Sequence, residues 1–180
     1  IDHLEQELSK LDLDGYKLVA EEIERQGIQG INFRVLTGKS EHVSHGHHGD
    51  IHRGYQEICT LIGKSDLGAG IKARALSIFQ RLGEAEAKVH GCSLESVHFH
   101  EVGAIDSIVD IVGACVGFEY LGVEHFYSGP LNLGGGTVTF SHGTWPVPAP
   151  ATAELVTSFP TLVGTIQGEL TTPTGAAVVT

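Results

Sequence analysis

The sequence predicts an α/β fold in which mixed sheets pack against helices. Two patterns support this prediction. Hydrophobic residues recur at helical spacing over Ser65–Val89 and Ile105–Leu121. By contrast, Tyr16–Arg25 and Thr137–Phe140 show the alternation that is typical of half-buried strands. With 180 residues, 41% of them hydrophobic, the chain can bury the core of one ordinary domain.

The character of the sequence changes near Gly91, which leaves two organisations open. One is a single domain. The other consists of two small lobes, residues 1–91 with a histidine-rich loop and residues 92–180 without a lysine or arginine. The sequence contains no internal repeat or linker that would decide between them.

The first half of the chain predicts helices around one hairpin. Apolar spacing predicts a short helix at Leu4–Leu11, and the turn 27–30 joins two strands into a hairpin. Asp50 is the expected N-cap of a helix over Ile51–Ile62, and Ser65 that of the helix ending at Gly91.

The second half predicts shorter elements around one apolar helix. Because Ile105–Leu121 is apolar on nearly every face, we expect it to be the most buried helix, with Gly122 ending it. The remaining elements are four strands and two helices, the helices starting at Pro150 and near Thr172. The strands are expected at Ser96–Val102, His125–Ser128, Thr137–Phe140 and Leu162–Ile166, and the first of the helices at Pro150–Ser158.

The charge distribution excludes some partners. All 11 lysines and arginines lie between Lys10 and Lys88, whereas eight carboxylates follow Val89 without any cation. A nucleic-acid surface needs such cations, so we expect no nucleic acid as a partner, and the net charge of −11 suits a divalent cation instead. No apolar run is long enough to predict a membrane span.

Cysteine usage predicts a reducing, cytoplasmic location. Cys59, Cys92 and Cys115 are scattered, so we expect no disulfide framework and interpret all three as small buried hydrophobic residues. The chain lacks methionine and ends within a predicted helix, so we expect it to be part of a longer protein.

Five histidines within eleven residues form the first candidate metal site. Neutral imidazole suits zinc, copper, iron and nickel, and the interspersed glycines would let the ligands gather around one ion. The alternative is a loop that binds metal only weakly, as histidine tracts often do. The candidate ligands are His42, His45, His47, His48 and His52.

A second cluster combines imidazoles with carboxylates. On a strand, His98 and His100 point to the same side. On the helix that follows, Asp106 and Asp110 share a face near its N-terminus, where a carboxylate is favoured. We therefore expect these four residues and Glu101 to converge on one pocket, because no Lys or Arg is nearby in sequence to pair with the carboxylates. The alternative is an N-cap at Asp106 and two core histidines.

Two weaker signals follow further along the chain. The loop Gly134-Gly135-Gly136 could cradle a phosphate with backbone N–H groups, although a tight turn is the better explanation of the glycines alone. His142, before the proline-rich connector Pro146–Pro150, could be a positioned ligand or acid–base group, or only a surface histidine.

Three long stretches, in this order, resemble the LarC family. They are His98–Ile111, Trp145–Leu155 and Gly168–Ala176, and the histidine loop followed by His52-Arg53 is also similar. The resemblance extends over nearly the whole chain and is sharpest from Val97 onward. The N-terminal segment of the family that contains glycine and aspartate is missing here, and so is the C-terminal region that binds CTP.

The resemblance implies a specific reaction. Family members insert Ni(II) into pyridinium-3,5-bisthiocarboxylic acid mononucleotide, using CTP with Mn(II) or Mg(II), to complete the nickel-pincer cofactor of lactate racemase. It implies a metal-inserting enzyme of the lyase class, and this chain alone is expected to be inactive without the CTP-binding region. A nickel chaperone or storage module without catalysis is the alternative, and a homo-oligomer is an open arrangement.

Roles within that reaction can be assigned by chemistry. The metal ligands would be the histidines of the loop together with His98 and His100. A carboxylate near the metal could accept the proton that the ring loses, which assigns Glu101, Asp106 and Asp110 as catalytic. The glycines 134–136 and His142 would bind the mononucleotide.

Overall fold

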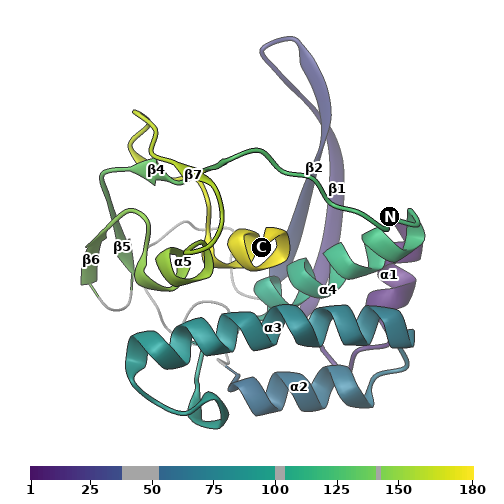
Figure 1. Ribbon diagram of the computed structural model, residues 1–180. Helices are drawn as coiled ribbons and strands as arrows, with labels where there is room; N and C mark the ends of the chain where they lie inside the picture. The colour runs from purple at the N-terminus through teal and green to yellow at the C-terminus, as the bar shows by residue number, and fades with distance from the viewer. Residues whose placement is uncertain (38–52, 100–103, 141–142) are drawn as a thin grey trace.

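The computed structural model describes residues 1–37, 53–99, 104–140 and 143–180. Within these ranges, helices pack on one another and two-stranded sheets flank them, so the predicted α/β class with mixed sheets is confirmed (Figure 1). None of the described helices combines the length and the apolar character needed to cross a membrane.

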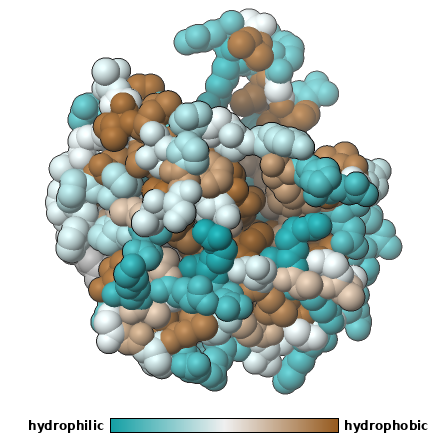
Figure 2. All heavy atoms as spheres, viewed as in Figure 1, coloured by the Kyte–Doolittle hydropathy of each residue, from teal (hydrophilic) through white to brown (hydrophobic). Residues whose placement is uncertain are grey.

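The N-terminal helix and the hairpin come first. Helix α1 spans Asp2–Leu8, and strands β1 (Tyr16–Arg25) and β2 (Ile28–Thr37) pair antiparallel, so β1 has the predicted bounds. The turn is shorter than predicted, because Gln26 and Gly27 adopt φ values of 53° and 81° and close a two-residue loop. The hairpin extends beyond the body of the molecule (Figures 1 and 2).

Helix α2 covers Tyr55–Lys64 and begins later than predicted. Gly54 is its N-cap, in extended conformation, because Gly54 forms an antiparallel bridge with His98 and the Tyr55 N–H donates to Val97 O at 3.0 Å. The predicted helical start at Ile51 is therefore wrong for residues 53 and 54, and Asp50 lies outside the described residues.

Helix α3 covers Ala69–His90, with Gly68 rather than Ser65 as its N-cap. Ser65 instead ends α2, where its hydroxyl donates to Ile62 O at 2.7 Å. The predicted stop at Gly91 is confirmed, since Gly91 adopts the left-handed conformation with φ 63°.

Helix α4 (Ile105–Tyr120) lies in the core against α3 and α1. Six of its 16 residues are buried, against seven of 22 in α3 and three of six in α5, so α4 is more buried than the other long helix but is not the most buried of the described helices. Gly122 follows the C-cap at φ 64°, as predicted. The buried residues of α4 are Ile108, Val109, Ile111, Val112, Cys115 and Val116.

Before α4, the chain forms less strand than predicted. The 3-10 turn η1 covers Leu94–Ser96, and the described part of the predicted strand Ser96–Val102 contributes one bridge, at His98. Phe99 is fully buried and contacts the Phe79 ring at a centroid distance of 6.3 Å. This contact fixes the segment to α3.

The C-terminal part contains small sheets and two short helices. Strand β3 (Leu131–Asn132) pairs parallel with β7 (Thr161–Leu162), and β4 (Gly134–Gly135) pairs antiparallel with β8 (Gly168–Glu169). The strands β5 (Thr137–Phe140) and β6 (Gly143–Pro146) are antiparallel, and the helices are α5 (Pro150–Leu155) and α6 (Pro173–Val179), both packed on α3.

Two predicted strands in this part are wrong. His125–Ser128 has no regular structure and no pairing partner among the described residues, and Tyr127 is 92% exposed. Leu162–Ile166 is a strand only at Leu162, because the chain then turns so that Gly164 approaches the Asn132 side chain. Pro150 starts α5 as predicted, but the helix ends at Leu155, before Ser158.

Candidate functional site

Asp106 and Asp110 form an exposed carboxylate pair at the start of α4. Ala104 is the N-cap of this helix, so the alternative that Asp106 caps it is wrong. Asp106 Oδ1 accepts a hydrogen bond from the Ser107 N–H at 2.8 Å. Asp110 follows one turn later, and both side chains are exposed. Their sequence spacing places the two carboxylates on one face of the helix.

The surroundings of Asp110 favour its protonated form. Desolvation by the protein around it raises the pKa of this carboxyl, and the negative charge of Asp106 raises it further. Among the described residues, no Lys or Arg forms an ion pair with either carboxylate. A carboxylate with a raised pKa is a stronger base than an ordinary aspartate.

His98 precedes α4 in the chain, and its side chain is exposed. Its neighbours Val97 and Phe99 are buried, so the alternation predicted for this segment is present and the core-histidine alternative is wrong for His98. A Cβ placed on Gly54 would lie 3.4 Å from His98 Nδ1, which shows that the imidazole lies against the start of α2.

The complete second cluster lies partly outside the described residues. His100 and Glu101 are not described, and in the described part of the chain no three His, Cys, Asp or Glu side chains lie close enough together to hold a metal ion. His98, Asp106 and Asp110 alone therefore do not make a metal site. Convergence of all five residues stays a prediction.

The loop histidines also stay predictions. Residues 38–52, which contain His42, His45, His47, His48 and His52, lie outside the described residues, as does His142.

The glycines at 134–136 lie in a tightly packed segment rather than an open loop. Gly134 and Gly135 form β4, and a Cβ on Gly134 would lie 1.9 Å from Gly168 O. A Cβ on Gly136 would lie 2.2 Å from Gln167 Oε1. The contact with the Gly168 backbone explains the glycine at 134, and the φ of 78° favours glycine at 136, whereas phosphate binding by the N–H groups of residues 134–136 stays a prediction.

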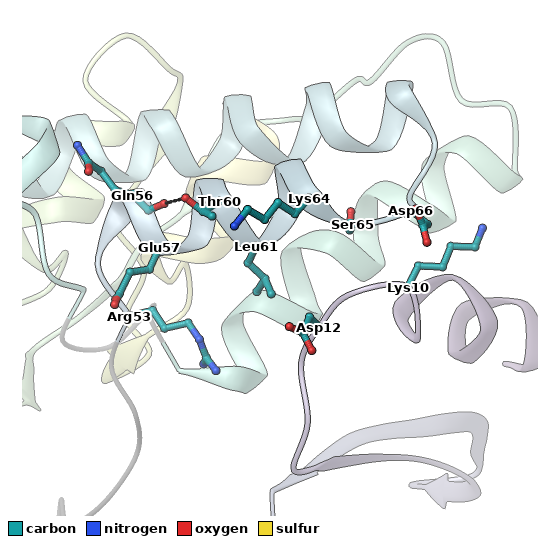
Figure 3. A pocket seen from close by; sticks show the side chains of 10 residues that line it. All are labelled: Lys10, Asp12, Arg53, Gln56, Glu57, Thr60, Leu61, Lys64, Ser65 and Asp66. Carbon is teal, nitrogen blue, oxygen red and sulfur yellow. Dashed lines mark hydrogen bonds between the residues drawn. The ribbon is translucent and has the colours of Figure 1, made fainter.

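A cleft of about 620 Å³, which no sequence pattern predicts, lies beside α2. Figure 3 shows its lining, which comes from the segment after α1, from Arg53 just before the N-cap of α2, from one face of α2 and from the turn that follows. Three of the 11 cations of the chain line it. Their separation in sequence, at Lys10, Arg53 and Lys64, explains why no local motif revealed them.

The cysteines differ in environment, which corrects one expectation. All three lie in described parts of the chain and are free, but Cys92 is exposed and Cys59 is half-buried, so the prediction of three buried thiols holds only for Cys115. Burial raises the pKa of the Cys115 thiol to about 11.

We expect an alkylating reagent to modify Cys92 rapidly in the folded chain and Cys115 only after unfolding, because the thiolate is the reactive species. Mass spectrometry of peptides, with and without denaturant, measures the difference. Equal labelling of both residues in the folded chain would contradict the buried environment of Cys115.

This chain is similar to a class of proteins that handle nickel. The family model described as "Nickel insertion protein" matches residues 1–180, and the chain belongs to that family. No solved structure matches the chain significantly.

Curated relatives are longer than this chain. A "Pyridinium-3,5-bisthiocarboxylic acid mononucleotide nickel insertion protein" from Desulfitobacterium hafniense is 48% identical over 177 residues, which cover 98% of this chain and 42% of the relative. Proteins with the same name from Akkermansia muciniphila and Staphylococcus epidermidis are 50% and 43% identical and are covered to 44% and 42%. The chain thus spans less than half the length of these relatives.

Proposed function

We propose that this chain takes part in inserting Ni(II) into pyridinium-3,5-bisthiocarboxylic acid mononucleotide. The product would be the nickel-pincer cofactor of lactate racemase. The observation that carries the proposal is the carboxylate pair Asp106 and Asp110. It lies exposed at the start of α4 without a cationic partner among the described residues, in a chain of the nickel insertion family.

The chemistry of insertion requires a proton acceptor. When a ring carbon bonds to Ni(II), its C–H bond breaks, the electron pair forms the Ni–C bond, and the proton must leave. Asp110, whose pKa is raised, takes this proton, and Asp106 supports it by its negative charge. Glu101 is a third candidate for this role, in the segment between His98 and α4.

Imidazoles suit the delivery of nickel. Nitrogen ligands hold Ni(II) and release it to the softer sulfurs of the two thiocarboxylates. His98 is exposed and available, and His100 and the five loop histidines complete the proposed delivery set. Gly134, Gly135, Gly136 and His142 are proposed to contact the mononucleotide.

The remaining components belong to the complete protein. CTP with Mn(II) or Mg(II) would bind a C-terminal region beyond this chain, so the chain alone would not complete the lyase-type reaction. The three free cysteines favour a reducing compartment such as the cytoplasm. Lactate racemase would receive the product.

A nickel storage or chaperone module is the second candidate function. The dense histidine loop favours it, because five imidazoles lie within eleven residues and histidine tracts bind metals. A storage module binds nickel in proportion to its own concentration, whereas an insertase converts the mononucleotide to the nickel-loaded product.

Substituting His45 or His47 by Ala in the complete protein is expected to lower cofactor production only at limiting Ni(II). The loop has spare imidazoles, so saturating nickel compensates for the loss of one ligand. Production is measured as conversion of the mononucleotide with CTP at low and high Ni(II). Nickel binding without any conversion in the unsubstituted protein would support storage and contradict the insertase.

A further inference from the structure

The cleft beside α2 has a lining of mixed charge. It has three cations, Lys10, Arg53 and Lys64, and three carboxylates, Asp12, Glu57 and Asp66. Its volume of about 620 Å³ falls within the range of small-molecule sites. A lining with both signs suits a ligand that carries an anion at one end and hydroxyl groups elsewhere, because cations bind the anion and carboxylates accept from hydroxyls.

Arg53 is the most unusual residue of this cleft. Its Nη1 atom is buried, yet it has no hydrogen-bond partner among the described residues. A buried guanidinium N–H without a partner is costly, so Arg53 lacks an acceptor that the described residues do not supply. Figure 3 shows the guanidinium turned toward the side of the cleft where Asp12 lies.

The other charges of the cleft differ in availability. Lys64 has no ion pair with a described residue, and its side chain runs back along α2 toward Thr60 (Figure 3). Lys10 is paired with Glu7, and Glu57 accepts a hydrogen bond from the Gly54 N–H at 2.7 Å. Arg53 and Lys64 are therefore the cations free to bind an anion, and Asp12 and Asp66 are the carboxylates that such an anion would face.

We propose that this cleft binds the ribose phosphate of a pyridinium mononucleotide, with Arg53 as the phosphate ligand. The inference rests on the proposed function, which supplies the mononucleotide. Residues 89–180 contain no Lys or Arg, so cationic partners for a phosphate within this chain must come from its first half. The cleft gathers Arg53 and Lys64 there, and Asp12 accepts from a ribose hydroxyl.

The position of Arg53 connects this subsite to the proposed chemistry. Arg53 directly follows His52 in the chain and lies one residue before Gly54, which pairs with His98. A phosphate held by Arg53 is thus anchored beside the segment that carries the exposed imidazole of His98. The anchor would orient the ring while leaving the metal-binding groups of the substrate free.

Nicotinamide mononucleotide is a suitable probe because it contains the pyridinium ring, ribose and phosphate but no thiocarboxylate to bind nickel. Isothermal titration of the complete protein, without nickel and CTP, is expected to show binding that Arg53→Gln weakens roughly 10- to 100-fold, as for loss of a charge-assisted contact. Nicotinamide riboside, which lacks the phosphate, should bind weakly and equally to both proteins.

Arg34→Gln provides the matched control, since Arg34 is an exposed hairpin arginine paired with Glu21 at 2.7 Å and lies outside the cleft. Lys64→Gln should weaken binding of the mononucleotide as well, though less than Arg53→Gln. Circular dichroism and the unfolding midpoint exclude a folding defect as the cause.

Failure of this inference is distinguishable from failure of the proposed function. Unchanged affinity of Arg53→Gln, equal binding of the nucleotide and the riboside, or no binding of the nucleotide at millimolar concentration would each overturn the phosphate subsite. Nickel insertion by the unsubstituted protein, measured separately, would still stand in all three cases.

Discussion

Asp110→Asn in the complete protein is expected to abolish production of the nickel-loaded cofactor at both low and high Ni(II). Asn keeps the shape of the side chain but cannot accept the ring proton. Because the pKa of Asp110 is raised, production by the unsubstituted protein should decline on the acid side at a higher pH than an ordinary aspartate would give. Conversion of the mononucleotide with CTP, followed across pH, measures both effects.

The fold of this variant should persist. The pKa of Asp110 is raised in the folded state, so folding favours the protonated carboxyl. The stability that this group contributes is therefore present at low pH and is lost as the pH rises. At neutral pH the ionised carboxylate disfavours folding. Asp110→Asn should therefore be at least as stable at neutral pH as the unsubstituted protein. Such a gain in stability with a loss of activity is typical of a functional residue.

Asp14→Asn is the control for this experiment, because Asp14 is an exposed aspartate that lies outside α4. It should leave both activity and stability unchanged. Full activity of Asp110→Asn at both nickel concentrations would show that the carboxylate is a surface charge only, and the histidine loop would become the main candidate.

Sequence periodicity predicted the long elements well. Strand β1 has the predicted bounds, and α4 differs from its prediction by one residue at its end. Both segments carry their pattern over many residues, so a single conformation satisfies nearly all side chains at once. The glycines at 91 and 122 were predictable for a local reason, because they end helices in a left-handed conformation.

The wrong predictions of secondary structure fall where contacts between residues far apart in sequence determine the conformation. The start of α2 depends on the bridge between Gly54 and His98, two residues far apart in sequence, and Asp50 as a local capping signal could not reveal it. His125–Ser128 contains two aromatic residues, which favour strands, but a strand also needs a partner, and none is present among the described residues.

The candidate site was predictable only in part, for the same reason. Spacing along one helix places Asp106 and Asp110 together, and alternation exposes His98. The cleft around Arg53 escaped prediction because the segment after α1, the helix α2 and the turn at Asp66 each contribute isolated side chains. Packing of separate elements brings these residues together, and no local sequence pattern indicates that they are neighbours.

Gly134→Ala is expected to destabilise the 180-residue chain by about 3 kcal/mol or more, because strain and steric clash combine at this position. Gly134 has φ +85°, which an L side chain rarely adopts, and its Cβ would lie 1.9 Å from Gly168 O. A flexible side chain could move away, but this oxygen belongs to the backbone of β8. The pairing of β4 with β8 would have to open.

Gly129→Ala is the matched control for this substitution, since a Cβ at the exposed Gly129 meets nothing within 4 Å. Urea unfolding followed by circular dichroism should give a lower midpoint for Gly134→Ala and a nearly unchanged midpoint for Gly129→Ala. Equal midpoints would show that β4 and β8 can separate at little cost. In that case close packing would not explain the glycine, and backbone N–H groups of residues 134–136 open to a phosphate would become the better explanation.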